Sequence, residues 1–318
     1  MEELIEGLAP DIVISNTTLV LAKYVPSNPR TMKVQIFHSV PYKNYIIVPE
    51  TLAYDLVLLP GKYHKNTLVE RFKVEERNKL KAVGWPRTDN FFNHRLSPKE
   101  KNDLMKKFDL DPALKTVLYA PTWDAFHEKG LFPRSFGPVA EAFDRFCREL
   151  KKFNVNLVMK LHPYAHKLIE HSGLHEIADK YKVCLAYKKP TRCLDRAVKD
   201  FLFITDVLIS DVSGIITDFM VLNRPIVYIE PDVDPEGNKI NWCETDLPKE
   251  YRAGEIVNSM DGLIQGVKRS LKNPDEYKPQ RQDTLQKLFF KLDGHSSERA
   301  ASEILSSYNE FIKEGRVS

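Results

Sequence analysis

Short apolar runs and longer stretches with helical periodicity alternate along the chain. The strand-like runs cover residues 11–15, 33–38, 55–59, 80–84, 116–120, 156–161, 183–187, 207–210 and 226–229. The helix-like stretches cover residues 62–72, 97–108, 139–153, 166–181, 192–203, 212–220, 260–272, 280–291 and 296–312. The second of them opens with a capping box from Ser97 to Glu100. Alternation of this kind is typical of parallel sheets with helices on their faces, so the pattern predicts an α/β fold.

One strand-turn-helix-strand unit, residues 201–230, carries a signal for anion binding. Its first strand, Val207–Ser210, runs into a turn at Asp211–Gly214. Apolar residues then recur at the spacing of one helix face, at positions 212, 215, 216, 219 and 220. The first N–H groups of a helix lack partners inside it, so Ser213 and Gly214 predict a phosphate site. A plain helix cap is the structural alternative.

The order of the elements predicts two doubly wound domains with a ligand between them, at the carboxyl ends of the strands. The boundary is expected between Arg95 and Lys115. We assign residues 1–95 to a short N-terminal Rossmann-like domain and residues 96–300 to a C-terminal one. Residues 301–318 are expected to form a helix that packs back toward the N-terminal domain.

The composition narrows the class of protein. The chain has 318 residues, a formal net charge of +3 and four cysteines that show no metal-ligand spacing. We therefore expect no nucleic-acid partner and a reducing compartment. The sequence has no run of about 18 apolar residues and no signal peptide, which indicates a cytoplasmic protein. The basic stretch 268–291 would suit peripheral contact with an anionic membrane, although such a run is more often a solvated helix face.

Polar residues follow several of the predicted strands, and strand ends converge in a doubly wound sheet. The segments are Phe37-His38-Ser39, Gly84-Trp85-Pro86-Arg87, Pro121-Thr122-Trp123-Asp124, Lys160-Leu161-His162-Pro163 and Ser210-Asp211-Val212-Ser213. His38 would suit a general base, although alone it is more often a structural histidine at a strand end. Lys160 and His162 would hold a diphosphate, and a structural turn with a solvated lysine is an equal alternative.

Two further sets complete the candidates. Asp218 lies two helical turns after Asp211, where it would accept a ribose hydroxyl or face solvent. Ser296 and Arg299, at the start of the last helix, would close over a phosphate, but we slightly favour an ordinary helix cap. No GxGxxG, GxxxxGK[ST], GxSxG or HExxH motif is present, which argues against a dinucleotide, P-loop, hydrolase or zinc site. We therefore expect no cofactor and no metal.

Together, these motifs resemble the CDP-glycerol glycerophosphotransferases that build teichoic acids. Residues 204–219 and 223–228 are similar to that family's "ITDYSS…FD…RP" run, and 37–43 to its "WHGTPLK". Residues 84–89 look like "GYPRND", 120–124 like "APTWRD", 160–163 like "KxHP", and 293–299 like the closing "DG…S…R". The order of the motifs is specific, whereas each motif alone is weak. Ser39 and Gly214 depart from the family pattern.

The resemblance implies a GT-B type fold, an acceptor-side N-terminal domain and a nucleotide-donor C-terminal domain. It implies transfer of a polyol phosphate, most simply glycerol phosphate, from a CDP-polyol to a lipid-linked or polyol-phosphate acceptor, with release of CMP. His38 would act as base and His162 would assist the diphosphate. Ser213, Gly214, Lys160, Ser296 and Arg299 would bind donor phosphate, and Thr122, Asp211, Asp218 and Arg87 would make other donor or cleft contacts.

Two alternatives stay open at this point. One is a GT-B glycosyltransferase or nucleotide-sugar epimerase that uses a UDP- or GDP-sugar. The other is a non-catalytic nucleotide-binding protein. The resemblance places the protein in the cytoplasm, in peripheral contact with the inner face of the membrane, and the sequence carries no signal for an oligomeric state.

Overall fold

The chain divides into two compact units. The computed structural model describes residues 10–16, 30–37, 48–74, 77–121, 132, 136–161, 173–186, 194–211, 213–230 and 251–313. Unit 1 comprises Met1–His94 and Asp283–Ser318, and unit 2 comprises Arg95–Gln282. The segment before the last helix packs on unit 1, since the Phe290 N–H donates to the Pro60 carbonyl at 2.8 Å.

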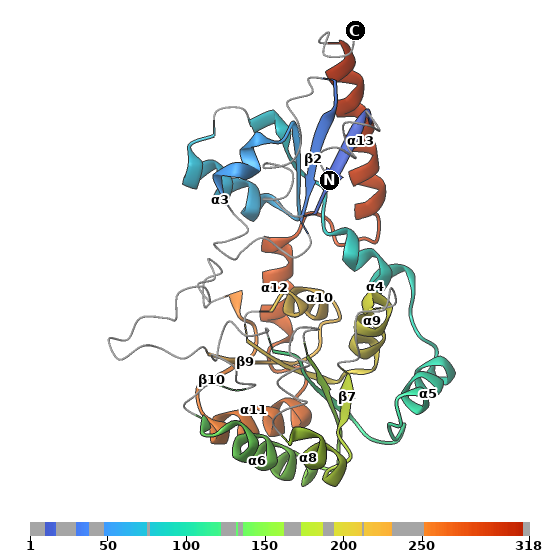
Figure 1. The fold of residues 1–318 in the computed structure, drawn as a ribbon, viewed down its shortest axis with the longest axis vertical. Coiled ribbons are helices and arrows are strands. Elements are labelled where there is room, and N and C mark those ends of the chain that lie inside the picture. Colours follow the sequence, from blue (N-terminus) through green and yellow to red (C-terminus); the bar gives the residue numbers. More distant parts are fainter. Residues whose placement is uncertain are drawn as a thin grey trace. The chain divides into compact units, whose positions relative to one another are not determined.

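Unit 1 contains a four-stranded parallel sheet in the order β1-β2-β3-β4. The strands are β1 (Ile12–Ser15), β2 (Met32–Ile36), β3 (Leu56–Leu59) and β4 (Leu80–Ala82). The helices α3 (Lys62–Phe72) and α13 (Ser296–Phe311) lie on opposite sides of this sheet (Figure 1). The short elements of unit 1 are η1 (Pro49–Ala53), η2 (Arg77–Lys79), η3 (Pro86–Thr88) and α4 (Asp89–Asn93).

The core under α13 is built by the alternation of β2 and β3. Met32, Val34, Leu56 and Leu58 point to one face, where they pack with Ala300 and Phe311 of α13. Because α13 belongs to the C-terminal part of the chain, the sheet formed by residues 12–82 is covered on this face by a helix more than 200 residues away.

Unit 2 contains a six-stranded parallel sheet in the order β10-β9-β8-β5-β6-β7. Its strands are β5 (Thr116–Tyr119), β6 (Asn156–Lys160), β7 (Cys184–Ala186), β8 (Val207–Ser210), β9 (Ile226–Ile229) and β10 (Glu255–Val257). Its helices are α5 (Pro98–Lys107), α6 (Val139–Lys151), α8 (Leu174–Lys180), α9 (Leu194–Ile204), α10 (Ile215–Met220) and α11 (Met260–Lys272). The helix α12 (Lys278–Leu288) crosses the boundary between the units.

The predicted α/β fold class with parallel sheets is confirmed. The helices α6, α8 and α11 cover one face of the unit 2 sheet, and α9 and α10 lie on the other (Figure 1). The predicted capping box is present, since the Ser97 hydroxyl accepts the Glu100 N–H while a Glu100 carboxylate oxygen accepts the Ser97 N–H.

Some elements differ from the sequence-based expectation. The helix α10 begins at Ile215, directly after the segment predicted as a turn, in which the Ser213 N–H donates to the Asp211 carboxylate. Strand β10 was not predicted. It has only three residues and starts with a glutamate, and it pairs with β9 because Gly254 lets the backbone approach the Ile226 carbonyl closely. The expected start of the helix at 166 lies outside the described residues.

No helix among the described residues is both long enough and apolar enough to span a bilayer. In the same part of the chain, no group of three or more His, Cys, Asp or Glu side chains is arranged to hold a metal ion.

His64, in the first turn of α3, generates a prediction about pH. Its side chain is 0% exposed, neither ring nitrogen has a hydrogen-bond partner in the described structure, and burial lowers its pKa to about 3. A histidine with a folded pKa below its unfolded value contributes stability above the unfolded value, near 6.5, and loses it as the pH falls toward the folded pKa. Between pH 7 and pH 5, the free energy of unfolding should therefore fall by about 2 kcal/mol through this residue.

Replacement of His64 by leucine should flatten this dependence in urea unfolding measured across the same pH range. His295→Gln is the matched control, because its side chain is 56% exposed. An equal slope in wild-type protein and His64→Leu would contradict the assignment.

Candidate functional site

The carboxyl ends of β5, β6 and β8 gather the candidate residues of unit 2. These strands are neighbours in the order β8-β5-β6, and all run parallel. The Ser210 hydroxyl at the end of β8 donates to the Ala120 carbonyl at 2.6 Å, which ties the ends of β8 and β5 together. In doubly wound sheets this edge is where ligands bind.

Lys160, the last residue of β6, is a buried cation. Its side chain is 8% exposed, and its Nζ donates to the Leu161 carbonyl at 3.0 Å. No carboxylate lies within ion-pair distance of this ammonium among the described residues. Burial lowers its pKa, because the charged form has lost water and gained only a carbonyl. A buried ammonium of this kind would be stabilised by an anion.

The turn after β8 uses most of its own N–H groups. The Asp211 carboxylate accepts the Ser213 N–H at 3.1 Å, and the Ser213 hydroxyl accepts the Ile215 N–H at 3.5 Å. The Ser213 carbonyl accepts the Ile216 N–H at 3.1 Å. Within residues 213–216 of the described turn, the Gly214 N–H alone has no acceptor. The predicted row of free N–H groups is therefore reduced to one, because the aspartate and serine side chains take the others.

The two candidate aspartates, Asp211 and Asp218, are both buried. Asp211 is 6% exposed and Asp218 is 4% exposed. Asp218 therefore does not face solvent, which was one of the two alternatives for this residue. Tyr119, also buried, has its pKa raised well above the ordinary value by burial and by the negative charge of Asp211. Asp211 therefore places negative charge beside the end of β5 while it shapes the Ser213 turn.

Two arginines at the opposite edge of this sheet, beside the amino end of β9, bind protein carbonyls. Arg224, in the "RP" motif, donates from Nη1 to the carbonyls of Phe203 and Thr205, at 2.8 and 2.6 Å. Arg281 is 0% exposed and was not singled out in the sequence. It donates to the side chain and carbonyl of Asn223 and to the Pro274 carbonyl, at 3.0 to 3.2 Å. Asn223 has a positive φ of 53°, and this buried pairing holds the turn before β9. Both arginines therefore connect separate backbone segments through their guanidinium donors.

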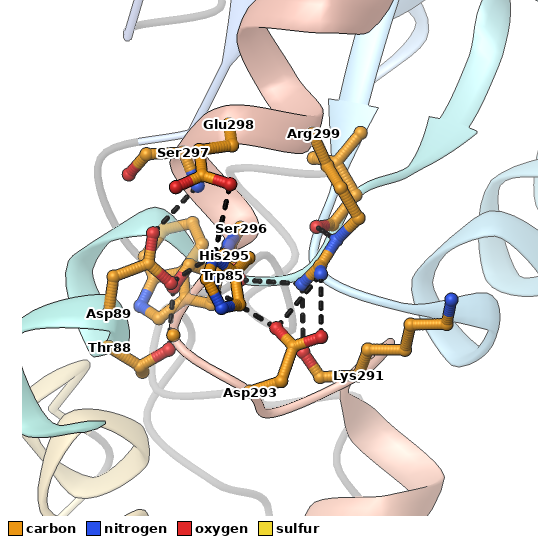
Figure 2. Close-up of polar contacts among 12 residues, drawn as sticks. Trp85, Thr88, Asp89, Lys291, Asp293, His295, Ser296, Ser297, Glu298 and Arg299 are labelled. Carbon is orange, nitrogen blue, oxygen red and sulfur yellow. Dashed lines mark hydrogen bonds and ion pairs between the residues drawn. The ribbon is translucent and has the colours of Figure 1, made fainter. Parts of the chain in front are cut away.

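In unit 1, the "GWPRTD" and "DG…S…R" segments form one polar cluster (Figure 2). The Asp89 carboxylate accepts the N–H groups of Ser296 and Ser297 at 3.0 and 2.7 Å, and so caps the N-terminus of α13. Arg299 donates to both Asp293 carboxylate oxygens at 2.8 Å. We call Asp89, Asp293, Ser296, Ser297 and Arg299 the Asp89 clamp.

Arg299 uses every donor it has. Besides Asp293, it donates to the Val83 carbonyl at 2.9 Å, the Lys291 carbonyl at 2.9 Å and the Ser296 hydroxyl at 3.2 Å. Its guanidinium and the Ser296 hydroxyl lie against Gly84, which has a φ of 93° and no room for a Cβ. In the described structure, Arg299 and Ser296 thus bind groups of unit 1, and the cap of α13 comes from Asp89 and not from a local serine.

The remaining candidates are distributed as follows. Arg87 is an exposed residue of η3 in unit 1. His38, Thr122 and His162 lie outside the described residues. Five candidates belong to unit 2 and lie at or after the ends of β6 and β8, two strands that are separated only by β5. They are Lys160, Asp211, Ser213, Gly214 and Asp218.

Two parallel α/β units in one chain, with polar residues at the carboxyl ends of the strands, define a protein of GT-B type. A solved structure of the wall teichoic acid polymerase TagF matches with a TM-score of 0.70 and 19% identity, over 95% of this chain and 74% of that chain. The UDP-GlcNAc 2-epimerase of Methanocaldococcus jannaschii matches with a TM-score of 0.62 and 13% identity, over 96% of this chain and 78% of that chain. At these identities the likeness shows the fold alone.

The chain belongs to the CDP-Glycerol:Poly(glycerophosphate) glycerophosphotransferase family, whose model matches residues 7–306. It is 29% identical over 239 residues to the teichoic acid ribitol-phosphate polymerase TarL of Staphylococcus aureus, which covers 75% of this chain but only 39% of that protein. It is 24% identical over 299 residues to a teichoic acid glycerol-phosphate transferase of the same species, over 87% of this chain and 72% of that protein. The family predicted from the motifs is confirmed.

The Arg299 contacts generate a prediction that separates structure from donor binding. Arg299→Lys should lower the free energy of unfolding by about 2 kcal/mol, because a lysine cannot replace the planar set of donors and leaves the part-buried Val83 carbonyl without its partner. The affinity for a CDP-polyol, measured by calorimetry, should stay unchanged.

The control is Arg145→Lys. Arg145 forms an exposed ion pair with Asp261, with side chains 41% and 80% exposed, so its replacement should change stability by no more than about 0.5 kcal/mol. If Arg299→Lys weakens donor binding and leaves stability intact, Arg299 belongs to the donor site after all.

Proposed function

We propose that this protein transfers a polyol phosphate from a CDP-polyol to a hydroxyl of a membrane-associated acceptor and releases CMP. The proposal is supported by membership of the family and by one structural observation, the buried Lys160 ammonium at the carboxyl end of β6. A diphosphate would supply the anion that this cation lacks among the described residues. Glycerol phosphate is the first candidate for the transferred group.

The donor would be held mainly by unit 2. Lys160 would pair with the diphosphate, and the Gly214 N–H and Ser213 hydroxyl would bind one of its oxygens. Asp218 and Asp211 are buried near the same turn, where Asp211 orients Ser213 through its N–H. Charge-assisted hydrogen bonds in a water-poor site are strong, so few groups suffice to position the phosphate.

The chemistry would be an in-line displacement at phosphorus. His38 would take the proton of the acceptor hydroxyl, whose oxygen forms a new bond to the phosphorus that carries the polyol. The bond between this phosphorus and the oxygen bridging it to CMP breaks. His162 would stabilise or protonate the leaving CMP phosphate. Such a reaction requires positioning and charge stabilisation more than covalent participation of the protein.

For the polyol and for the acceptor, we propose a chemical class and not one compound. The relatives are named both as glycerol-phosphate and as ribitol-phosphate enzymes, so the donor is a CDP-polyol in the first instance. The acceptor would be a lipid-linked or polyol-phosphate chain. We propose a cytoplasmic protein at the inner face of the membrane, as the family resemblance implies.

The basic stretch 268–291 does not supply an apolar membrane anchor. Leu288 and Phe289 are 0% and 5% exposed, so they belong to the core. Arg269, Lys278 and Lys287 form ion pairs with Glu255, Asp275 and Asp283. These contacts fit the alternative of a solvated helix face.

The competing functions differ in their donor. A glycosyltransferase or epimerase on this fold would bind a UDP- or GDP-sugar, and a non-catalytic protein would bind a donor without turnover. In a thermal-shift screen, we expect CDP-glycerol or CDP-ribitol to raise the melting temperature, because a ligand that binds only the folded state stabilises it by mass action. UDP- and GDP-sugars at the same concentrations should give no shift, and the reverse result would assign a different donor.

Lys160→Met tests the observation that carries the proposal. We expect the affinity for CDP-glycerol to fall by about 10- to 100-fold, since a hydrogen bond to a charged group contributes about 1.5–3 kcal/mol. The variant should fold at least as well as the wild type, because it removes a buried charge.

Lys152→Met is the matched control in the same unit. This lysine side chain is 62% exposed and pairs with Glu149, so its replacement should not change donor affinity. Unchanged affinity in Lys160→Met would remove Lys160 from the donor site.

His38→Ala should abolish CMP release while donor binding persists.

A further inference from the structure

The first turn of α3, in unit 1, is an uncapped helix end. The helix begins at Lys62, shortly after β3 ends at Leu59, so its N-terminus lies at the carboxyl edge of the four-stranded sheet. Doubly wound sheets bind ligands at this edge. Gly61 precedes the helix and has no side chain that could cap it. The N–H groups of Lys62 and His64 have no acceptor among the described residues, so the positive end of the helix is not neutralised there.

The charges of this turn are the reverse of those that a helix N-terminus favours. Acidic side chains stabilise this end of a helix, and the first turns of α5, α6, α8, α11 and α13 each contain one. The first turn of α3 contains none. Lys62 and Lys65 lie three residues apart on one face of it, and neither ammonium has a partner in the described part of the chain. These two cations and the helix dipole repel one another, and a bound anion would relieve that repulsion.

The side chain of His64 points to a ligand independently. It is buried, and neither ring nitrogen has a hydrogen-bond partner within the described ranges. Because helical side chains lean toward the N-terminus of their helix, the ring lies over the same first turn. A neutral imidazole carries one N–H donor, and a buried donor without an acceptor is unfavourable. An oxyanion at the end of α3 would supply this acceptor.

We propose that the first turn of α3 is an anion site that binds a phosphate of the polyol-phosphate acceptor. The phosphate oxygens would accept from the N–H groups of Lys62 and His64 and from the His64 ring, and the ammonium groups of Lys62 and Lys65 would balance the charge. A tetrahedral phosphate presents oxygens in several directions, which suits donors from backbone, ring and ammonium better than a planar carboxylate does.

This inference rests on the proposed function, which requires an acceptor of this chemistry. The phosphates of the donor are assigned to Lys160 and Ser213 in unit 2, whereas the site at α3 belongs to unit 1. The phosphate bound at α3 would therefore be one that the acceptor chain already contains, and not the phosphate that is transferred. Its role would be to hold the acceptor, so its loss should affect KM for the acceptor before any other constant.

The test measures the binding of a short oligo(glycerol phosphate) by calorimetry, with the donor site filled by CDP. We expect the double variant Lys62→Gln and Lys65→Gln to raise the dissociation constant at least tenfold, and KM for this acceptor by a similar factor. The dissociation constant of CDP-glycerol should stay within twofold. Lys62 is exposed and Lys65 is half-buried, so the double variant should fold. In the wild type, NMR signals of the His64 ring nitrogens and of the Lys62 amide should shift during the titration.

The matched control is the double variant Lys73→Gln and Lys313→Gln. It removes the same charge from two exposed lysines of unit 1, one at the C-terminal cap of α3 and one just beyond α13. It should leave the binding of the oligomer and KM within twofold of the wild type. Inorganic phosphate should bind more weakly than the oligomer, and binding to phosphatidylglycerol vesicles should be equal in the wild type and in the Lys62 and Lys65 variant.

Unchanged binding of the oligomer in the folded Lys62 and Lys65 variant would overturn the proposal, and so would NMR shifts confined to residues outside α3. Inorganic phosphate bound as tightly as the oligomer would assign the site to a free ion, and vesicle binding lost in the variant would assign it to a lipid headgroup. Either result would overturn the assignment to the acceptor. If the wild type releases no CMP from any CDP-polyol, the proposed function fails, and the anion site is still judged by the phosphate titration and the His64 signals.

Discussion

The Asp89 carboxylate binds the first N–H groups of α13 and so helps to set where the helix that covers the unit 1 sheet begins. It satisfies backbone donors that would otherwise be orphaned, and it places a negative charge at the positive end of the helix. It also fixes where α13 begins relative to β4. Since α13 supplies Ala300 and Phe311 to the core, the packing of Met32, Val34, Leu56 and Leu58 follows from where this helix is held.

Arginine and lysine have different roles in this protein. The motif arginines Arg224 and Arg299 bind backbone carbonyls, and so does the buried Arg281. A planar guanidinium has five donors in a fixed geometry, and the turns and strand ends of the fold satisfy most of them. The ammonium of Lys160 is a compact charge, and one carbonyl does not satisfy it. Of these four described cations, Lys160 is therefore the one that an anion would stabilise most.

Much of the fold could be predicted from local pattern. The strand Val207–Ser210 and the helices Lys62–Phe72 and Met260–Lys272 have the bounds expected from the sequence. Buried parallel strands are continuous apolar runs, and the helix Met260–Lys272 follows a capping serine, Ser259. Strand β10 carried no such signal, since three residues at a sheet edge need only one buried side chain.

The candidate site was less predictable for a different reason. Motif resemblance identified Ser296 and Arg299 as important, and Asp89 as part of a motif, but periodicity contains no information on contacts between segments 200 residues apart. For the same reason, the loss of free N–H groups at Ser213 became visible only with the Asp211 contact. The sequence identifies these residues, but only the structure shows which groups they bind.

The discontinuity of unit 1 has a consequence for its biosynthesis. The ribosome makes the four strands of its sheet first, then the whole of unit 2, and α13 after both. Until α13 emerges, the apolar face of β2 and β3 has no cover from its native helix, whereas unit 2 is contiguous and can complete its core during translation. The nascent N-terminal sheet is thus the part of the chain most in need of protection from aggregation, and its last covering element is also the one that closes the clamp.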